Sequence, residues 1–312
     1  MSIFNNKIII FLIIILSLYI IIYVISKIEC KLCKINTFYI KNDKNSDKIK
    51  LIFISDFHNK KFKNGFKDLI DSIISLNPDY IVFGGDFVDF STIHSKKNEV
   101  KYKRSMDFIE KLAKKYEEIK DNKNYNLKRI FFGFGNHELR LKSRTDNIEL
   151  IGIYNSFIKH IMDCGVKLLD DTTFKLSDGI TISGLNLYEG YYKNMFERNN
   201  LHKSIDKEII NKHFHNLDKN NFNIMVFHKP DYCENFIDYG YDLVLSGHTH
   251  GGLINFPLIG PIFSPDLDLF PKYNSGLYKY KNKSVIVSSG IGEHFIKIRV
   301  NNRPEICLIN IE

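Results

Sequence analysis

The longest apolar run of the chain lies close to its N-terminus. No residue from Ile8 to Ser26 is charged, and Lys7 and Lys27 flank the run. At a rise of about 1.5 Å per residue, a helix of this length nearly matches a hydrocarbon core of about 30 Å. We therefore predict one membrane-spanning helix. A cleaved signal peptide is the alternative, but the run exceeds a usual signal-peptide core and no small-x-small cleavage site follows it.

Beyond a stretch rich in Lys, Asn and Asp (residues 41–50), short apolar runs alternate with helical patterns. Apolar positions recur at helical spacing over residues 66–74, 106–116 and 151–161, and Asn77-Pro78 ends the first of these patterns. Short continuous apolar runs predict buried strands at 51–55, 80–83, 130–132, 180–183, 224–227, 243–245, 285–287 and 306–309.

Strand–helix alternation in the first half and strand-rich sequence in the second predict a layered α/β fold with central sheets. No Gly-, Ser- or Pro-rich linker divides the body. We therefore expect an anchor with its flanks at residues 1–34, a connecting segment at 35–48 and one large domain at 49–312. The polar stretch from Tyr188 to Asn221 is expected to form a surface loop or a lid.

Net charge and cysteine content say little about the partners of the protein or about covalent cross-links. The formal net charge of +8 favours anionic partners such as phosphate groups, acidic lipids or nucleic acid, although a Lys-rich solvated surface explains it equally simply. The five cysteines are odd in number and scattered, so no disulfide framework is predicted. Cys30 and Cys33 form a lone C-x-x-C pair, for which neither a metal nor a redox role is predicted.

The charges beside the apolar run bear on its orientation. Lys27, Lys31, Lys34 and Lys41 on the C-terminal side outnumber Lys7 on the other. The positive-inside rule then favours a single-pass protein of the cell membrane with its large domain in the cytoplasm. Long domains can be exported regardless of flanking charge, so an external domain stays open.

Side chains able to bind a metal follow five of the predicted strands. These residues are Asp56 and His58, Asp86, Asn136 and His137, His228, and His248 and His250. Ligands of α/β folds bind where strands end, so the pattern predicts polar side chains along one edge of a sheet. Each short motif alone could be a turn, but alternating histidines between glycines in residues 247–252 place two imidazoles on one side. Together and in this order, the motifs predict one site.

These motifs resemble a known family. Asp56-x-His58, Gly85-Asp86, Gly135-Asn136-His137-Glu138, His228 and Gly247-His248-Thr249-His250 resemble the five signature blocks of calcineurin-like metallophosphoesterases. Residues 78–89, 228–232 and 290–292 are similar to the membrane-anchored branch of the family, which includes bacterial enzymes similar to UDP-2,3-diacylglucosamine pyrophosphatases. The likeness runs from about residue 49 to the C-terminus and implies a four-layer α-β-β-α sandwich preceded by one transmembrane helix.

The resemblance also implies a role for each residue of the blocks. It assigns Asp56, His58 and His250 to a first divalent metal ion, Asn136, His228 and His248 to a second, and Asp86 to both. His137 would face the substrate and protonate the leaving oxygen or stabilise phosphoryl charge. Mixed nitrogen and oxygen ligands suit manganese, iron, zinc or nickel better than calcium. Asn59-Lys60-Lys61 departs from the small residues that the family often has there, which puts substrate contacts near this loop in doubt.

The expected function is hydrolysis of phosphoester or pyrophosphate bonds by a metal-activated water, on a phosphorylated small molecule or a lipid-linked or envelope-derived substrate. An anchored nucleotide phosphodiesterase and a catalytically silent metal-binding scaffold are the alternatives. Retention of all seven expected ligands and of His137 counts against the scaffold. No basic patch interleaved with aromatic residues stands out, so no nucleic-acid partner is expected.

A few other polar and aromatic residues near the motifs receive structural interpretations. Asp89 and Glu138 are candidates for orienting the imidazoles, and Lys229 is expected to be solvated rather than to bind phosphate. Tyr188, Tyr191 and Tyr192 are expected to pack in the core or at the surface, with the lining of a substrate entrance as the alternative.

Overall fold

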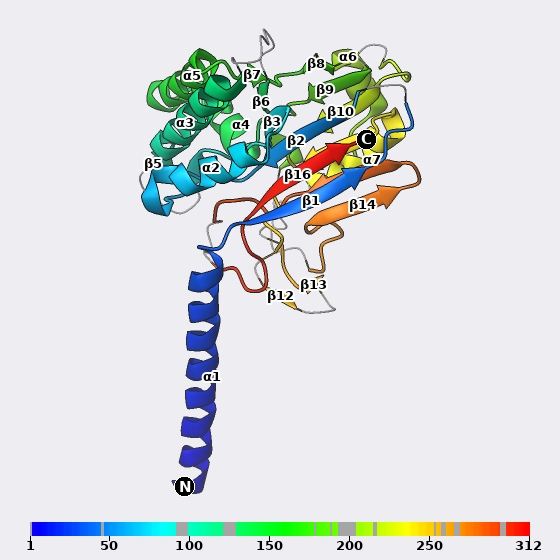
Figure 1. Cartoon of the computed structure of the whole chain (residues 1–312). Coiled ribbons are helices and arrows are strands. Elements are labelled where there is room, and N and C mark those ends of the chain that lie inside the picture. Colours follow the sequence, from blue (N-terminus) through cyan, green and yellow to red (C-terminus); the bar gives the residue numbers. More distant parts are fainter. Residues whose placement is uncertain are drawn as a thin grey trace.

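A computed structural model describes most of the chain as a body from which one long helix projects (Figure 1). The described residues are 2–44, 47–91, 99–120, 129–177, 179–187, 189–192, 204–214, 217–252, 254–256, 260–264, 269–293 and 298–312. The projecting helix is α1 (Ser2–Glu29), and its part from Lys7 to Glu29 is long and apolar enough to cross a membrane. The apolar side chains along this part are exposed, as expected for a helix that is not packed into the body.

Two six-stranded sheets form the centre of the body. The first has the order β1 (Lys34–Ile40), β16 (Glu305–Ile311), β2 (Ile49–Ile54), β3 (Tyr80–Phe83), β6 (Ile130–Phe132) and β7 (Lys167–Leu168). The second has the order β14 (Gly276–Tyr280), β15 (Lys283–Val287), β11 (Leu243–Ser246), β10 (Phe222–Val226), β9 (Ile180–Gly184) and β8 (Thr172–Ser177). Two small sheets pair β4 (Asp89–Ser91) with β5 (Glu99–Lys101), and β12 (Asn255–Phe256) with β13 (Gly260–Pro261).

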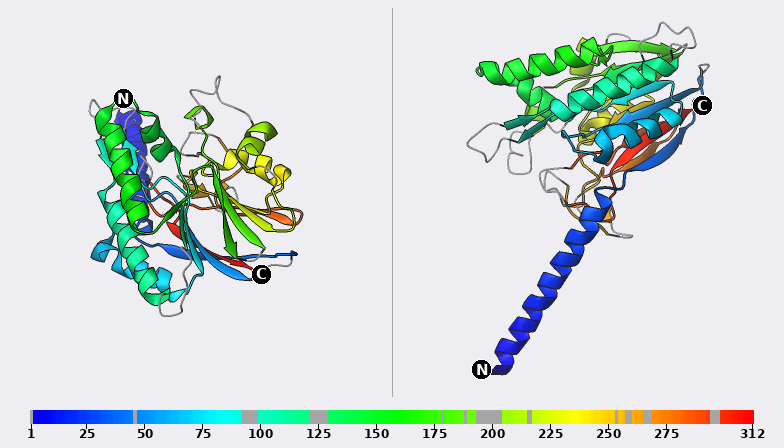
Figure 2. Two further views of the ribbon diagram at one scale, coloured as in Figure 1. Left: turned by 90° about the horizontal axis from the view of Figure 1, so that it is seen from above. Right: turned by 60° about the vertical axis from the view of Figure 1, so that its left-hand side comes forward.

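Helices cover the outer face of each large sheet, as the view from above shows (Figure 2). On the side of the first sheet lie α2 (Lys67–Ser75), α3 (Lys103–Lys120), α4 (Asn136–Ser143) and α5 (Ile148–Asp163). On the side of the second lie α6 (Lys207–His213) and α7 (Cys233–Tyr239). Short 3-10 turns occur at η1 (Lys63–Phe66), η3 (Glu189–Tyr191) and η5 (Pro230–Tyr232). The four-layer α-β-β-α sandwich is therefore confirmed.

The central strands read as unbroken apolar runs because both of their faces are buried. Leu51 and Phe53 of β2 belong to a core cluster that contains residues of both sheets, between which it lies. Ile52 and Ile54, which alternate with them, belong to the cluster that includes the helices. A strand with only one covered face would instead alternate apolar and polar residues.

The first sheet begins earlier in the chain than the sequence suggested. Strand β1 lies largely within the stretch expected to be a connecting segment, and it pairs in parallel with β16 from Lys34 opposite Glu305 to Ile40 opposite Ile311. Side chains along β1 alternate between exposed and partly buried, because it is the edge strand of the sheet. The exposed side chains are Ile35, Thr37 and Tyr39, whereas Lys34 and Asn36 lie on the partly buried side, so the strand has no continuous apolar run that would signal it.

The polar stretch from Tyr188 to Asn221 is described only in part. Residues 188, 193–203 and 215–216 lie outside the described residues. Within the rest, α6 buries Ile210 against the body. The lid remains a prediction.

Candidate metal centre

Five strands deliver the candidate ligands to one place. Asp56, Asp86 and Asn136 follow β2, β3 and β6 of the first sheet, whereas His228 and His248 follow β10 and β11 of the second. We expected the candidate ligands to lie along the edge of one sheet, but they lie along the adjoining edges of two sheets. His228 Nε2 lies 3.0 Å from Asp86 Oδ2 and 3.7 Å from Asp56 Oδ1, which joins the two sheets directly.

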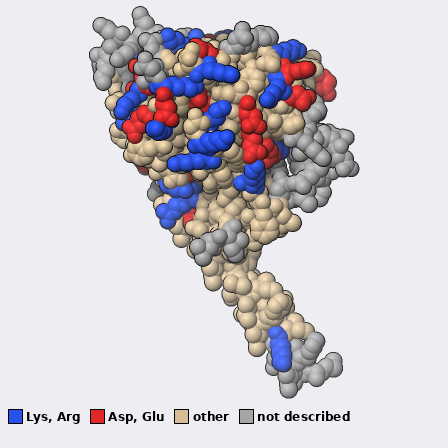
Figure 3. Space-filling view, turned by 90° about the vertical axis from the view of Figure 1, so that its right-hand side faces the viewer, with Lys and Arg blue, Asp and Glu red and all other residues tan. Residues whose placement is uncertain are grey.

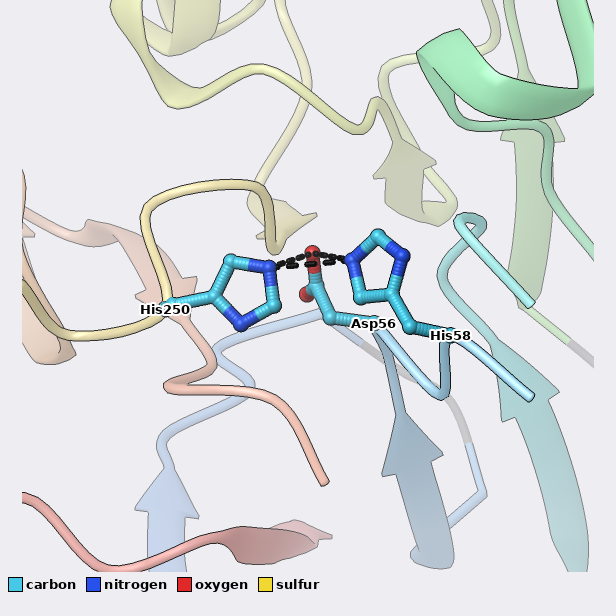
Figure 4. Close-up of side chains that lie close together, drawn as sticks. All are labelled: Asp56, His58 and His250. Carbon is cyan, nitrogen blue, oxygen red and sulfur yellow. Dashed lines mark hydrogen bonds and ion pairs between the residues drawn. The ribbon is translucent and has the colours of Figure 1, made fainter. Parts of the chain in front are cut away.

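Asp56, His58 and His250 form one compact group (Figure 4). Asp56 Oδ1 lies 3.4 Å from His250 Nε2 and 4.0 Å from His58 Nε2, and the two Nε2 atoms are 3.0 Å apart. Two ring nitrogens that face each other at this distance cannot both carry hydrogen. Nitrogens that bind one ion at about 2.1 Å also lie about 3 Å apart when their bonds are near right angles. The group therefore fits a metal cation.

Asp86 links two further groups that could hold an ion. One consists of Asp86, His58 and His137, and the other of Asp86, His228 and His248, with ligand atoms within 4.8 Å of one another in each. Asp86 Oδ2 lies 3.9 Å from both His58 Nε2 and His137 Nε2. Asp86 belongs to both of these groups, and a carboxylate has two oxygens with which to serve neighbouring ions.

Asn136 supplies an oxygen beside Asp86. It is the first residue of α4, and the next residue, His137, donates its backbone N–H to Asp86 Oδ1 over 2.9 Å. Asn136 Oδ1 is buried, and within the described residues it has no hydrogen-bond partner. Buried polar atoms nearly always have a partner, so this orphaned oxygen fits a metal ligand.

The backbone of most candidate ligands is strained. Non-glycine residues rarely adopt positive φ, and when they do so they cluster at functional sites. The φ angles are 54° at Asp56, 46° at His58, 55° at Asp86, 70° at His248 and 50° at His250. The surrounding structure therefore holds these residues in backbone conformations that are unfavourable for an unconstrained chain.

Two glycines of the sequence motifs allow the loops to approach the carboxylates. A Cβ atom at Gly135 would lie 2.1 Å from Asp86 Oδ1, and one at Gly247 would lie 2.3 Å from Asp56 Oδ2. Both distances are far below any van der Waals contact. Larger residues at these positions would displace the carboxylates, which explains why glycine precedes the ligands.

Hydrogen bonds fix the proton positions of two imidazoles. His228 Nδ1 lies 2.8 Å from the carbonyl oxygen of Gly84, which can only accept, so Nδ1 carries hydrogen and Nε2 is free toward Asp86. His137 Nδ1 accepts the backbone N–H of Phe90 over 2.7 Å, so neutral His137 carries its hydrogen on Nε2. His228 is thus prepared to bind a cation, and His137 is prepared to donate a proton.

The field between the carboxylates is strongly negative. Burial lowers the pKa of His228, but Asp86 and Asp56 outweigh it and raise this pKa to about 10. Burial also raises the pKa of Asp56, whereas at Asp86 the adjacent His228 and His137 overcome burial and hold its pKa well below the usual range. Protonated His228 supplies positive charge between the two buried carboxylates, and a bound cation would take the place of its Nε2 proton.

Glu138 supports the site through the backbone rather than by orienting an imidazole. Its buried carboxylate accepts the backbone N–H groups of Gly135, Asp86, Phe87 and Val88 over 2.8 to 3.0 Å. Burial and the Asp86 charge raise the pKa of Glu138 to about 7 against the opposing effect of these donors. Glu138 therefore joins the loop after β3 to the start of α4.

Three further residues near the site, Lys229, Tyr191 and Tyr192, are all buried. Lys229 is buried, and its Nζ lies 3.6 Å from Asp231 Oδ2. The prediction that this lysine is solvated is therefore wrong. Tyr191 and Tyr192 are buried as expected, and the Tyr192 ring centroid lies 6.2 Å from that of His248. Tyr188 lies outside the described residues.

Sequence reasoning missed two residues that hold His250. Buried Arg299 donates from Nη2 to the carbonyl oxygens of Ser289 (2.7 Å) and Gly292 (2.8 Å), and this nitrogen lies 3.4 Å from His250 Nδ1. Asn302 donates from Nδ2 to the carbonyl oxygen of His250 over 2.6 Å. Neither residue stands in a motif, and only the folded chain brings them next to residue 250.

Comparison with known proteins decides the family. The family model described as calcineurin-like phosphoesterase matches residues 49–252. The chain belongs to this family. Calcineurin-like phosphoesterases use divalent metal ions, and the three groups around Asp56 and Asp86 supply candidate ligands for them. The resemblance of the sequence motifs is thereby confirmed, and the chain is a hydrolase of phosphoester bonds.

Curated relatives agree with this phosphoesterase assignment. The metallophosphoesterase YkuE of Bacillus subtilis is 27% identical over 272 residues, which cover 85% of this chain and 80% of the relative. The UDP-2,3-diacylglucosamine pyrophosphatase LpxG of Chlamydia trachomatis is 26% identical over 84% of this chain and 83% of the relative. The phosphodiesterase YaeI of Escherichia coli is 34% identical over 28% of this chain and 32% of the relative.

Proposed function

We propose that the chain hydrolyses phosphoester or pyrophosphate bonds with two divalent metal ions, on a lipid-linked or envelope-derived substrate. Asp56, His58 and His250 hold the first ion, and Asn136, His228 and His248 hold the second. Asp86 bridges the ions, and His137 faces the substrate. Residues 49–312 form the catalytic domain, to which strand β1 contributes an edge, and residues 1–34 contain the anchor.

One observation carries this proposal. Asp86 belongs to two of the three groups of candidate ligands, and its Oδ2 atom lies within 3.9 Å of Nε2 of His58, His137 and His228. A structural metal site would favour a closed set of cysteines and histidines. A shared carboxylate among imidazoles instead suits two adjacent cations at a catalytic site.

The chemistry divides between the ions and the side chains. When bound, the ions supply positive charge for the phosphoryl oxygens and lower the pKa of the attacking water. His228 is oriented by its bond to Gly84, so that only Nε2 faces the site. His137, whose Nδ1 is occupied by the Phe90 N–H, offers its Nε2 proton to the leaving oxygen.

The ligand set restricts the ions. Imidazole nitrogens together with carboxylate and amide oxygens suit manganese, iron, zinc or nickel. Calcium prefers shells made entirely of oxygen. We use manganese as the test ion because it accepts both ligand types.

The substrate assignment rests on the anchor and on one relative. LpxG is named a UDP-2,3-diacylglucosamine pyrophosphatase, and helix α1 of this chain is long and apolar enough to place its domain beside a bilayer. Tethering raises the effective concentration of lipid-linked phosphates around the site. The lysines that follow the apolar run favour a cytoplasmic domain.

The test uses the full chain in phospholipid nanodiscs, stripped of metal and reloaded with manganese. We expect hydrolysis of bis-p-nitrophenyl phosphate, and we expect Asp86→Ala to abolish it together with metal binding. Asp107→Ala is the matched control, since its exposed carboxylate pairs only with Lys111 on α3 among the described residues. Equal rates for the wild type and Asp86→Ala would reject the proposal. A screen of membrane lipids, nucleotide-sugar lipids and cyclic nucleotides then separates a lipid substrate from the nucleotide alternative.

A further inference from the structure

Large apolar side chains are exposed around the β12–β13 hairpin. Phe256 is 43% exposed, Phe263 44%, Leu269 58% and Phe270 63%, and Phe263 and Leu269 pair in an isolated bridge. We call these four residues the apolar hairpin surface. Clustered exposed apolar groups usually mark a surface that another phase or molecule covers.

The apolar hairpin surface lies at the end of the body from which α1 leaves. Figures 1 and 2 both show β12 and β13 beside the top of α1. Hydrogen bonds through residues 299 and 300 connect the hairpin to α1. The backbone N–H of Asn255 in β12 donates to the carbonyl oxygen of Val300 over 2.9 Å, and the backbone N–H of Arg299 donates to Ser26 Oγ over 2.9 Å. Ser26 lies in the last turns of α1.

Helix α1 is fixed to the body rather than attached by a free linker. Ser26 and Cys30 are buried against it. Glu29 Oε2 accepts the backbone N–H of Asn302 over 3.0 Å, and Lys60 donates to the carbonyl oxygens of Cys30 and Ile291, each over 2.9 Å. These bonds set the direction in which the body faces a membrane that α1 crosses.

Hydrogen bonds link the candidate metal centre to the same end of the body. Asn302, whose N–H contacts Glu29, also donates from Nδ2 to the carbonyl oxygens of His250 (2.6 Å) and Gly252 (2.7 Å). His250 is a candidate ligand, and Gly252 stands just before the hairpin in sequence. The centre, the hairpin and the end of α1 therefore share one end of the body.

The charge distribution agrees with contact at that end. Figure 3 shows Lys and Arg mixed with Asp and Glu over the body, whereas the narrow part that leads into α1 is mostly uncharged. Phe and Leu side chains favour the boundary between headgroups and acyl chains. Exposed Lys31 follows α1 in the chain, where a cation can meet anionic headgroups.

We propose that the apolar hairpin surface inserts into the interface of the bilayer that α1 crosses, and that it presents the metal centre to the phosphate of a lipid in that bilayer. The membrane contact rests on α1 as a membrane-spanning helix, and the lipid phosphate rests on the proposed function. Because α1 is fixed to the body, both contacts occur at once. The enzyme then reaches phosphates in the membrane plane rather than those free in solution.

The first test uses the absence of tryptophan from the chain. Phe270→Trp in the full chain gives a single reporter, studied in phosphatidylcholine nanodiscs that contain lipids brominated near the headgroup. Bromine quenches only fluorophores within the bilayer, so we expect loss of at least half of the fluorescence. Ile148→Trp is the matched control, since Ile148 is 88% exposed at the start of α5. Equal quenching of the two reporters would overturn the membrane contact.

The second test separates membrane contact from catalysis. The Phe256→Ser/Phe270→Ser double variant is assayed on bis-p-nitrophenyl phosphate in solution and on hexadecyl p-nitrophenyl phosphate within the nanodisc. We expect an unchanged rate on the soluble diester and a loss of about tenfold on the embedded one, which corresponds to about 1.4 kcal/mol of interfacial binding. Equal losses on both substrates would overturn the proposal. A wild type inactive on both would instead refute the proposed function, while the quenching result would still decide the membrane contact.

Discussion

The two halves of the proposed metal centre draw their support from different parts of the molecule. In the anchor-side half, formed by the candidate ligands Asp56, His58 and His250, it is His250 that contacts Arg299 and Asn302. The backbone N–H groups of Arg299 and Asn302 bind Ser26 and Glu29 of α1. The far half, formed by Asn136, His228 and His248, is held by groups inside the sandwich. The carbonyl of Gly84 orients His228, and the carboxylate of Glu138 joins the loops on either side of Asp86.

This difference indicates what each half depends on. Support for the far half comes from residues close to the ligands in sequence or in neighbouring strands, so it forms with the core. Support for the anchor-side half comes from the two ends of the chain, since α1 precedes the sheets and residues 299–302 precede the last strand. Helix α1, the proposed anchor, therefore contacts the residues that support this half, and substitutions in the two halves should affect separate properties.

The largest effect is expected from Glu138→Ala in the far half. The change leaves the backbone N–H groups of Gly135, Asp86, Phe87 and Val88 without their acceptor in a buried site. Each orphaned donor costs about 1–3 kcal/mol, so we expect a loss of at least about 4 kcal/mol in the free energy of unfolding. Circular dichroism of the full chain in nanodiscs should show a thermal midpoint lower by about 8 °C or more.

Two companion variants interpret that result. Glu138→Gln keeps one acceptor oxygen and should lose less stability than Glu138→Ala. Glu118→Ala removes an exposed carboxylate of α3 that pairs with Lys115 at 3.8 Å, and should leave the midpoint unchanged. A midpoint for Glu138→Ala within two degrees of the wild type would mean that the four donors find other partners.

A smaller effect, confined to turnover, is expected from His137→Ala. Its Nε2 proton serves the leaving oxygen in our proposal, and loss of a general acid lowers kcat by about 10²–10⁴-fold. Manganese content, measured by mass spectrometry after dialysis, should stay at the wild-type value. His160→Ala on α5, whose Nε2 lies 3.4 Å from Glu110, is the control. A parallel loss of manganese and of kcat would instead make His137 a metal ligand.

The central fold could be predicted because burial leaves a simple mark on the sequence. Runs such as Tyr80–Phe83 have both faces covered, so they are apolar throughout and correspond to strands in the structure. The edge strand β1 was not predicted because the polar Lys34, Asn36 and Thr37 interrupt its apolar residues, so it forms no continuous apolar run. Helix α4 was not predicted because it begins at Asn136, within a ligand motif, and because its charged residues hide any helical periodicity of apolar positions.

The candidate ligands could be picked out because the motifs carry side chains able to bind metal, each placed after a strand, and the structure groups most of them together. Their convergence depended on which strands are neighbours, and the contact of His228 with Asp86 across two sheets is visible only in the fold. The roles of Arg299 and Asn302 were not predicted because their side chains bind mainly backbone carbonyl oxygens. A donor that binds backbone leaves no complementary residue elsewhere in the sequence to signal it.

In the anchor-side half, Asn302→Asp should weaken one ion and spare the other. The substitution keeps the size of the side chain but removes the Nδ2 donor to His250 and Gly252. Losing a group that positions a ligand lowers metal affinity by about 10–100-fold. Manganese titration by calorimetry should show one weakened site of two. Asn301→Asp is the control, because Asn301 is exposed. Equal weakening of both sites would contradict separate support for the halves.

The smallest effect is expected from the anchor itself. Ser26→Ala removes the acceptor of the buried Arg299 backbone N–H. One orphaned donor costs about 1–3 kcal/mol, which we expect to divide between the free energy of unfolding and the free energy of metal binding. We expect the manganese affinity of the anchor-side half to fall by up to about tenfold, with Ser26→Thr restoring it because the hydroxyl is retained. Ser17→Ala, on an exposed part of the same helix, should change nothing. If Ser26→Ala and Ser17→Ala bind manganese equally well, α1 is only a tether, and the anchor-side half owes its geometry to the body alone.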